Sequence, residues 1–223
     1  MSSIAVVERR DRLTGQAIHW SKKMKLAVFS TTIVALTLIS PTMVAAQTDA
    51  AATVQTLSDT LIATMREGPA LGFAGRSARL KPVIERSFDL ALATRLSIGP
   101  SWTKMSAADQ AALTDAIRRM TIAEYARNFA RWNGEAIRVD PRVTTRGADA
   151  LVRTTLTRRD GDPVVLAYRL RQTGGTWRII DVLFNGSISQ LATRRADYAR
   201  ILASGGAPAL VRHLDRATAN AAR

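Results

Sequence analysis

Four consecutive segments of the sequence alternate apolar with polar residues, and this pattern constrains the fold more than any other feature. In the third segment, Leu166 and Tyr168 would point to one side of a strand and Arg169 to the other. Short turns rich in glycine and aspartate separate the segments. The pattern predicts a four-stranded antiparallel meander, with strands over 136–143, 150–158, 163–172 and 176–185.

The rest of the chain has helical periodicity on both sides of the strand region. Gly68-Pro69 and Gly99-Pro100 would each end a helix. Ser106 with Asp109 indicates a helix start, because the serine hydroxyl can accept a hydrogen bond from an early backbone N–H. We expect an α+β fold in which a curled four-stranded antiparallel sheet and its flanking helices enclose an apolar cavity. The predicted helices cover 49–67, 76–96, 106–132, 187–202 and 208–221.

The first 46 residues have the composition of an export signal. Three lysines precede an apolar run over 26–39, and Pro41 breaks this run. Small residues ending at Ala46 predict cleavage there and export to the periplasm, which leaves one domain over 47–223. The apolar run is shorter than the ~20 residues that cross a bilayer, and an uncleaved anchor is the alternative. Met24 is a second candidate start.

The chain is strongly basic and contains no cysteine. It has 32 lysines and arginines against 18 aspartates and glutamates, which gives a formal net charge of +14. Such a charge favours anionic lipid headgroups or an acidic protein as a partner. We expect no nucleic-acid partner, because an exported protein rarely meets nucleic acid. The absence of cysteine excludes disulfides and thiolate metal sites.

The sequence offers little material for catalysis or metal binding. Beyond residue 46 the only histidine is His213, so we expect neither a Ser–His–Asp triad nor a histidine-rich metal site. Asp160 and Asp162 flank Gly161 in a predicted hairpin turn, where aspartate is favoured for backbone reasons. We therefore expect no catalytic residue, no metal and no cofactor.

The apolar face of the predicted strands has two interpretations. An antiparallel sheet with helices on one face can curl around a cavity, and small-molecule pockets are mostly apolar. An acyl chain in such a cavity would gain about 0.8 kcal/mol for each buried CH₂ group. The same side chains can instead form a solid core, and periodicity by itself favours the core.

Several short motifs follow one another between residues 54 and 214. They are Phe88-Asp89, Gly99 with Trp102, Tyr125, and Trp177 with Asp181 leading into Gly186 and Ser189. In order and spacing these motifs resemble the MlaC family. Members of that family are periplasmic carriers that shuttle phospholipid between the two membranes of a Gram-negative envelope.

The resemblance implies a curled sheet whose interior takes the lipid tails while the headgroup points outward. It implies two partners, an inner-membrane ABC transporter with an MCE-type subunit and an outer-membrane lipoprotein complex. The motifs at 88–89, 177–181 and 186–189 would fix sheet and helix junctions. The cavity lining would combine three helical residues with the apolar strand face: Leu92, Tyr125, Phe129, Val152, Leu156, Val164, Leu166, Tyr168, Leu170, Ile179 and Leu183.

Three alternatives to a phospholipid carrier follow from the sequence. A related branch, HpnM, is associated with hopanoids, whose rigid polycyclic shape would need a broader and more aromatic pocket. A small cone-shaped enzyme would place titratable residues in the pocket. A pure interaction module would bind an anionic membrane or a partner through its basic face, and modest added salt would abolish that binding.

Overall fold

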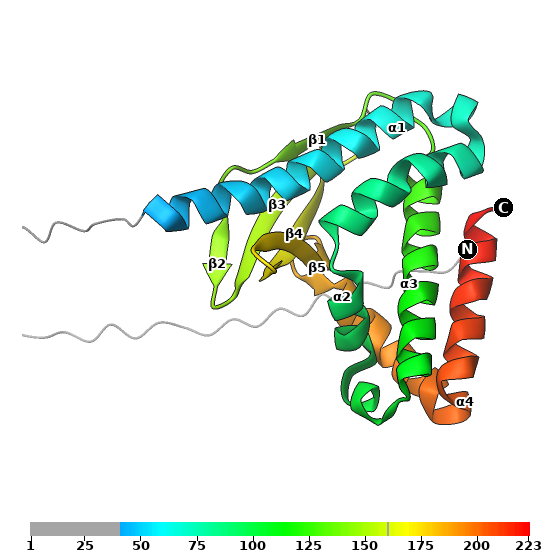
Figure 1. The fold of residues 1–223 in the computed structure, drawn as a ribbon. Coiled ribbons are helices and arrows are strands. Elements are labelled where there is room, and N and C mark those ends of the chain that lie inside the picture. The colour runs from blue at the N-terminus through cyan, green and yellow to red at the C-terminus, as the bar shows by residue number, and fades with distance from the viewer. Residues whose placement is uncertain (1–40, 160) are drawn as a thin grey trace, which may run out of the picture. The chain divides into compact units, whose positions relative to one another are not determined.

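The computed structural model describes residues 41–159 and 161–223, with side chains from residue 49 onward (Figure 1). The apolar run expected over 26–39 lies outside the described residues. The expected cleavage site at Ala46 lies in a stretch described by its backbone alone, so the boundary between signal and domain stays a prediction. Within the described ranges no helix has the length and apolar character needed to cross a bilayer.

A six-stranded antiparallel sheet forms the middle of the chain. Its order is β1-β3-β4-β5-β6, with β2 beside β3, and the sheet curls without closing, which confirms the expected fold class. The first strand, predicted over 136–143, ends at Val139, because Pro141 lacks the N–H that a sheet ladder requires. The short strands β2 and β6 were not predicted. The strands are β1 (Ala136–Val139), β2 (Thr144–Arg146), β3 (Asp149–Thr157), β4 (Val164–Thr173), β5 (Thr176–Phe184) and β6 (Ile188–Ser189).

The long helix α1 (Pro41–Ser87) changes direction at Gly72. The sequence predicts an end at Gly68-Pro69, but the helix continues to Gly72, whose φ of 61° a residue with a side chain rarely adopts. The guanidinium of Arg76 donates to the Gly68 carbonyl at 2.8 Å and also to the Ala126 carbonyl at 2.8 Å, so one side chain stabilises the kink and ties it to α3.

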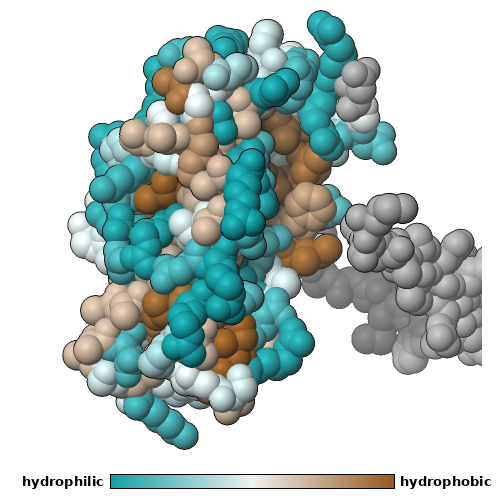
Figure 2. Space-filling model, turned by 90° about the vertical axis from the view of Figure 1, so that its right-hand side faces the viewer, coloured by the Kyte–Doolittle hydropathy of each residue, from teal (hydrophilic) through white to brown (hydrophobic). Residues whose placement is uncertain are grey.

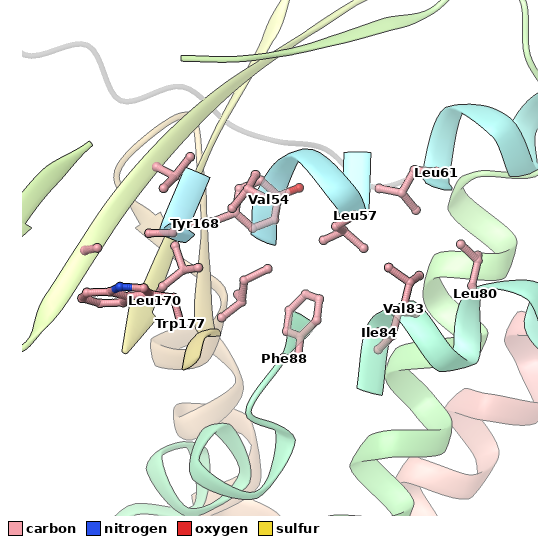
Figure 3. Close-up of a cluster of buried hydrophobic side chains, with 14 of the residues drawn as sticks. Val54, Leu57, Leu61, Leu80, Val83, Ile84, Phe88, Tyr168, Leu170 and Trp177 are labelled. Atoms are coloured by element: carbon pink, nitrogen blue, oxygen red, sulfur yellow. The ribbon is translucent and has the colours of Figure 1, made fainter. Parts of the chain in front are cut away.

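One face of the sheet packs against α1 and forms the first hydrophobic cluster, called the sheet cluster below. Figure 3 shows Val54 and Leu57 of α1 in the same cluster as Tyr168 and Leu170 of β4. The register pairs Val152 with Tyr168, which puts these side chains on that face. The sheet cluster also contains Leu61, Leu80, Val83, Ile84, Phe88, Trp177 and Ile179.

Three further helices form a second cluster, called the helix cluster. They are α2 (Leu90–Ile98), α3 (Ala107–Asn128) and α4 (Gln190–Ala221), with a 3₁₀ helix over Gly99–Lys104 between α2 and α3. The Ser106 hydroxyl accepts from the Asp109 N–H at 3.1 Å, which confirms the predicted cap of α3. The predicted break at Gly205-Gly206 is a kink within α4. The helix cluster contains Ile98, Leu113, Ile117, Met120, Tyr198, Leu210 and Leu214.

Candidate functional site

A pocket of about 590 Å³ lies between the curled sheet and helices α2, α3 and α4. Phe88 and Tyr168 of the sheet cluster line it, and so do Ile117 and Tyr198 of the helix cluster. The two clusters therefore meet here without filling the space between them. Its volume falls within the roughly 300–1,000 Å³ of small-ligand sites. Figure 2, which looks onto the side bearing α3 and α4, shows hydrophobic residues gathered between hydrophilic ones.

A row of three aromatic rings forms one wall of the pocket. The Tyr125 ring stacks on the Phe129 ring with centroids 5.6 Å apart and planes at 14°, and it meets the Phe88 ring edge-on at 5.8 Å and 70°. Tyr125 and Phe129 are four residues apart on or next to α3, so they lie on the same side of that helix. The row is a rigid apolar surface against which a hydrocarbon ligand can pack.

The charged residues of the pocket are largely engaged with one another or with backbone groups. Arg194 of α4 donates to the carboxylate of Glu124 on α3 at 2.6 Å, and both side chains are about two-thirds buried. The carboxylate of Asp181 accepts from the Ser189 hydroxyl at 2.6 Å and from the Leu191 N–H at 3.0 Å. These carboxylates therefore have hydrogen-bonding roles within the protein, and neither is poised as a free general base.

Burial raises the pKa of the pocket tyrosines. Desolvation raises the pKa of Tyr125 well above its usual value, and it raises the pKa of Tyr168 and Tyr198 to about 12. At neutral pH all three therefore carry their proton. In the described part of the chain no group of acidic, histidine or cysteine side chains has the arrangement to hold a metal ion. The site is suited to holding an apolar ligand.

Comparison with known proteins identifies the family. The family model described as MlaC protein matches residues 55–216. The chain belongs to the MlaC family. A solved structure from Ralstonia solanacearum, a phospholipid-binding protein in complex with a phospholipid, aligns with a TM-score of 0.65 and 26% sequence identity, over 78% of this chain and 99% of that one. A comparison with curated proteins finds no match.

Among the motifs that carry the MlaC resemblance, Asp89, Asp181 and Ser189 join helices to the sheet, whereas Phe88, Tyr125 and Asp181 line the pocket. Asp89 accepts from the Leu92 N–H at 2.9 Å and caps α2, while its own N–H donates to the Ile179 carbonyl of β5 at 2.9 Å. Asp181 and Ser189 join β5 to the start of α4. These contacts hold α2 and α4 against the sheet, on either side of the pocket.

The structure brings six of the eleven residues predicted for the lining to the pocket: Tyr125, Phe129, Leu156, Val164, Leu166 and Tyr168. Val152, Leu170 and Ile179 lie fully buried in the sheet cluster, toward the other end of the same sheet face. Leu92 is half-buried on α2 and is not part of the lining. Leu183 pairs with Ala167 on the opposite face, because an irregularity in the β4–β5 register at Arg169/Leu170 inverts the alternation of β5 beyond Ile179.

The predicted lining contained no residue of α4, and it omitted most of the residues that α2 and α3 contribute to the pocket. On α4, Leu191, Arg194 and Tyr198 line the pocket at spacings of three and four residues. That spacing was visible in the sequence and predicts a shared helix face, but it does not say what the face packs against. The other lining residues without a prediction include Phe88, Leu90, Ala93, Ser97, Ile117, Thr121, Glu124, Asn128, Arg158, Ile180, Asp181, Val182, Phe184 and Gln190.

Proposed function

We propose that this member of the MlaC family binds a phospholipid by its acyl chains in the pocket and carries it through the periplasm. The observation that carries the proposal is the aromatic and aliphatic lining of the pocket between sheet and helices. The structural match to a phospholipid-binding protein solved with a phospholipid supports it. Family membership supports a periplasmic location, with export directed by the first 46 residues.

Burial of apolar surface alone can give the pocket affinity for an acyl chain. Each CH₂ group that leaves water contributes about 0.8 kcal/mol, so a chain of several methylenes is held without any specific polar contact. The carboxylates of Glu124 and Asp181 in the lining are already engaged in hydrogen bonds within the protein. These properties favour a carrier over the cone-shaped enzyme, which would need a titratable group free to exchange a proton with its substrate.

Family membership also suggests where lipid is loaded and unloaded. We propose that the protein exchanges lipid with two partners. One is an inner-membrane ABC transporter with an MCE-type subunit, and the other is an outer-membrane lipoprotein complex. The carrier would not hydrolyse ATP itself. Transfer of labelled phospholipid from the purified chain to a reconstituted MCE-type transporter tests this step, and no transfer in either direction would contradict it.

A hopanoid is the second candidate cargo, and one observation favours it. Six aromatic residues line the pocket: Phe88, Tyr125, Phe129, Tyr168, Phe184 and Tyr198. Rigid polycyclic ligands pack well against such rings. The match to a phospholipid complex favours phospholipid, and lipid extraction distinguishes the two.

Native mass spectrometry with lipid extraction tests the proposed function directly. The full chain, exported by its own signal and purified from a Gram-negative envelope, should carry a phospholipid adduct. A hopanoid adduct would support the second candidate. A protein purified without any lipid would contradict both.

A matched pair of variants shows whether the pocket holds the lipid. Ala93 of α2 lines the pocket, whereas Ala91, two residues earlier, is exposed and does not. Ala93→Trp should fill ligand volume and lower lipid occupancy, while Ala91→Trp should leave it unchanged. Equal occupancy in the two variants would show that the lipid binds elsewhere.

A further inference from the structure

The face of the sheet opposite the pocket carries a concentration of arginine. The register places Arg171 of β4 directly opposite Arg178 of β5, and Arg153 of β3 next to Ala167 of β4. By the same register Arg138 pairs with Thr155 and Arg146 with Asp149. Together with Arg169, this set of six is called the arginine face: Arg138, Arg146, Arg153, Arg169, Arg171 and Arg178.

The positive charge of the arginine face is only partly neutralised within the protein. Asp149 binds Arg171 through two contacts of 2.6 and 3.0 Å and lies 3.7 Å from Arg169. Asp181, which the register pairs with Arg169, is buried, lines the pocket and holds the start of α4. The remaining four arginines form no ion pair with any described residue.

Two features show that the arginine face has unused capacity to bind anions. The buried Nε atoms of Arg169 and Arg178 have no hydrogen-bond acceptor among the described residues. Arg171 and Arg178 lie directly opposite each other, and like charges at such a position repel. An anion beside the exposed ends of the guanidinium groups would relieve this repulsion.

The composition of the face indicates the kind of partner. The register sets no aromatic side chain among the arginines; Leu151, Val165, Ala167 and Leu183 are its apolar members. Protein interfaces are usually anchored by buried aromatic residues at their centre. Neighbouring strands are about 4.8 Å apart, so guanidinium groups repeat over a short distance, and each can bind phosphate with two hydrogen bonds.

We propose that the arginine face docks this protein on an anionic membrane surface by binding the phosphate groups of lipid headgroups. The pocket is lined by the opposite sheet face, so docking and lipid occupancy use different residues. The proposal therefore does not rest on the proposed carrier function. A lipid surface could hold the protein by its outer sheet face while the pocket stays accessible.

Vesicle co-sedimentation of the full chain tests this docking. The protein should sediment with vesicles of phosphatidylcholine and phosphatidylglycerol and not with phosphatidylcholine alone. Binding should be lost in 1 M NaCl, where the Debye length is about 3 Å. Absence of binding to the anionic vesicles at low salt would overturn the proposal in favour of an acidic protein partner, and binding that survives 1 M NaCl would also overturn it.

Paired variants separate the arginine face from net charge. Arg138→Gln with Arg153→Gln removes two exposed charges from the face, and binding to anionic vesicles should weaken about fivefold per arginine. Arg212→Gln with Arg216→Gln removes two exposed charges from α4 and should have a much smaller effect. Equal weakening would show that net charge alone governs binding. Lipid retained in the pocket should be the same in both double variants.

Discussion

The carboxylate of Asp181, near the end of β5, accepts a hydrogen bond of 2.6 Å from the hydroxyl of Ser189, where α4 begins. The same hydroxyl oxygen accepts from the Ala192 N–H at 2.9 Å, and the other carboxylate oxygen accepts from the Leu191 N–H at 3.0 Å. Strand and helix are thus joined through the N-terminal donors of α4. This junction sets the direction in which α4 places Arg194 and Tyr198 beside the pocket.

Removing this carboxylate should destabilise the fold. Asp181→Ala leaves the part-buried Leu191 N–H and the Ser189 hydroxyl without their acceptor, which costs about 2 kcal/mol in unfolding free energy. Urea denaturation followed by circular dichroism measures this loss. Asp197→Ala, which removes an exposed carboxylate from the same helix, should change the unfolding free energy by less than about 0.5 kcal/mol. Similar losses in the two variants would contradict the proposed role of Asp181.

Neighbouring residues of β4 offer a test of the pocket lining. Leu166 lines the pocket, whereas Val165 is 37% exposed on the other face of the same strand. Leu166→Asp should lower lipid retention more than tenfold, because the loss of about 1.5 kcal/mol of apolar contact alone corresponds to about tenfold and the cost of a carboxylate in the lining adds to it. Val165→Asp should retain lipid as the unaltered chain does. Extraction and mass spectrometry of both proteins gives the comparison.

The sequence predicted the strands of the fold more accurately than the residues of the pocket. Strands β3, β4 and β5 were predicted within one residue at each end, because alternation with period two depends on the strand alone. A break in the helical pattern was expected over 68–75, but the geometry of the kink at Gly72 was not. It depends on Arg76 reaching the Gly68 carbonyl and on the neighbouring α3, contacts that local sequence does not encode.

Only part of the pocket lining was predicted. The reason is that alternation identifies a face of the sheet but not a position along that face. Val152 and Leu166 share a face, yet Val152 lies under α1 in the solid core and Leu166 lies where α1 no longer covers the sheet. One end of the apolar face thus forms solid core, and the other end borders the pocket. Leu183 was assigned to the same face because the irregularity at Arg169/Leu170 has no signature in the alternation of β5.

The ion pair between Glu124 and Arg194 should contribute a measurable coupling between α3 and α4. The pair is 2.6 Å long and each side chain is about 30% exposed, so water screens it only in part. Glu124→Gln should lower the unfolding free energy by about 0.5–1 kcal/mol. A double-mutant cycle with Arg194→Gln isolates the coupling energy. The exposed pair of Asp197 with Arg200 supplies the control cycle, in which a coupling near zero is expected.

The tyrosines predict how stability responds to alkaline pH. The chain has three tyrosines, and burial raises the pKa of each. An unfolded tyrosine ionises near pH 10, whereas Tyr168 in the folded protein has a pKa of about 12. Between these values the folded state binds more protons than the unfolded state, so the unfolding free energy falls as the pH rises above about 10.

The two-unit difference for Tyr168 corresponds to about 2.7 kcal/mol once the pH exceeds both pKa values. Tyrosinate absorbance should therefore stay low near pH 10 and rise together with the loss of helical circular dichroism. Tyr168→Phe removes one ionisable group from the unfolded chain and should move the midpoint of alkaline unfolding to higher pH. Tyrosinate absorbance that rises near pH 10 while the helices remain intact would show that the pocket tyrosines are open to water.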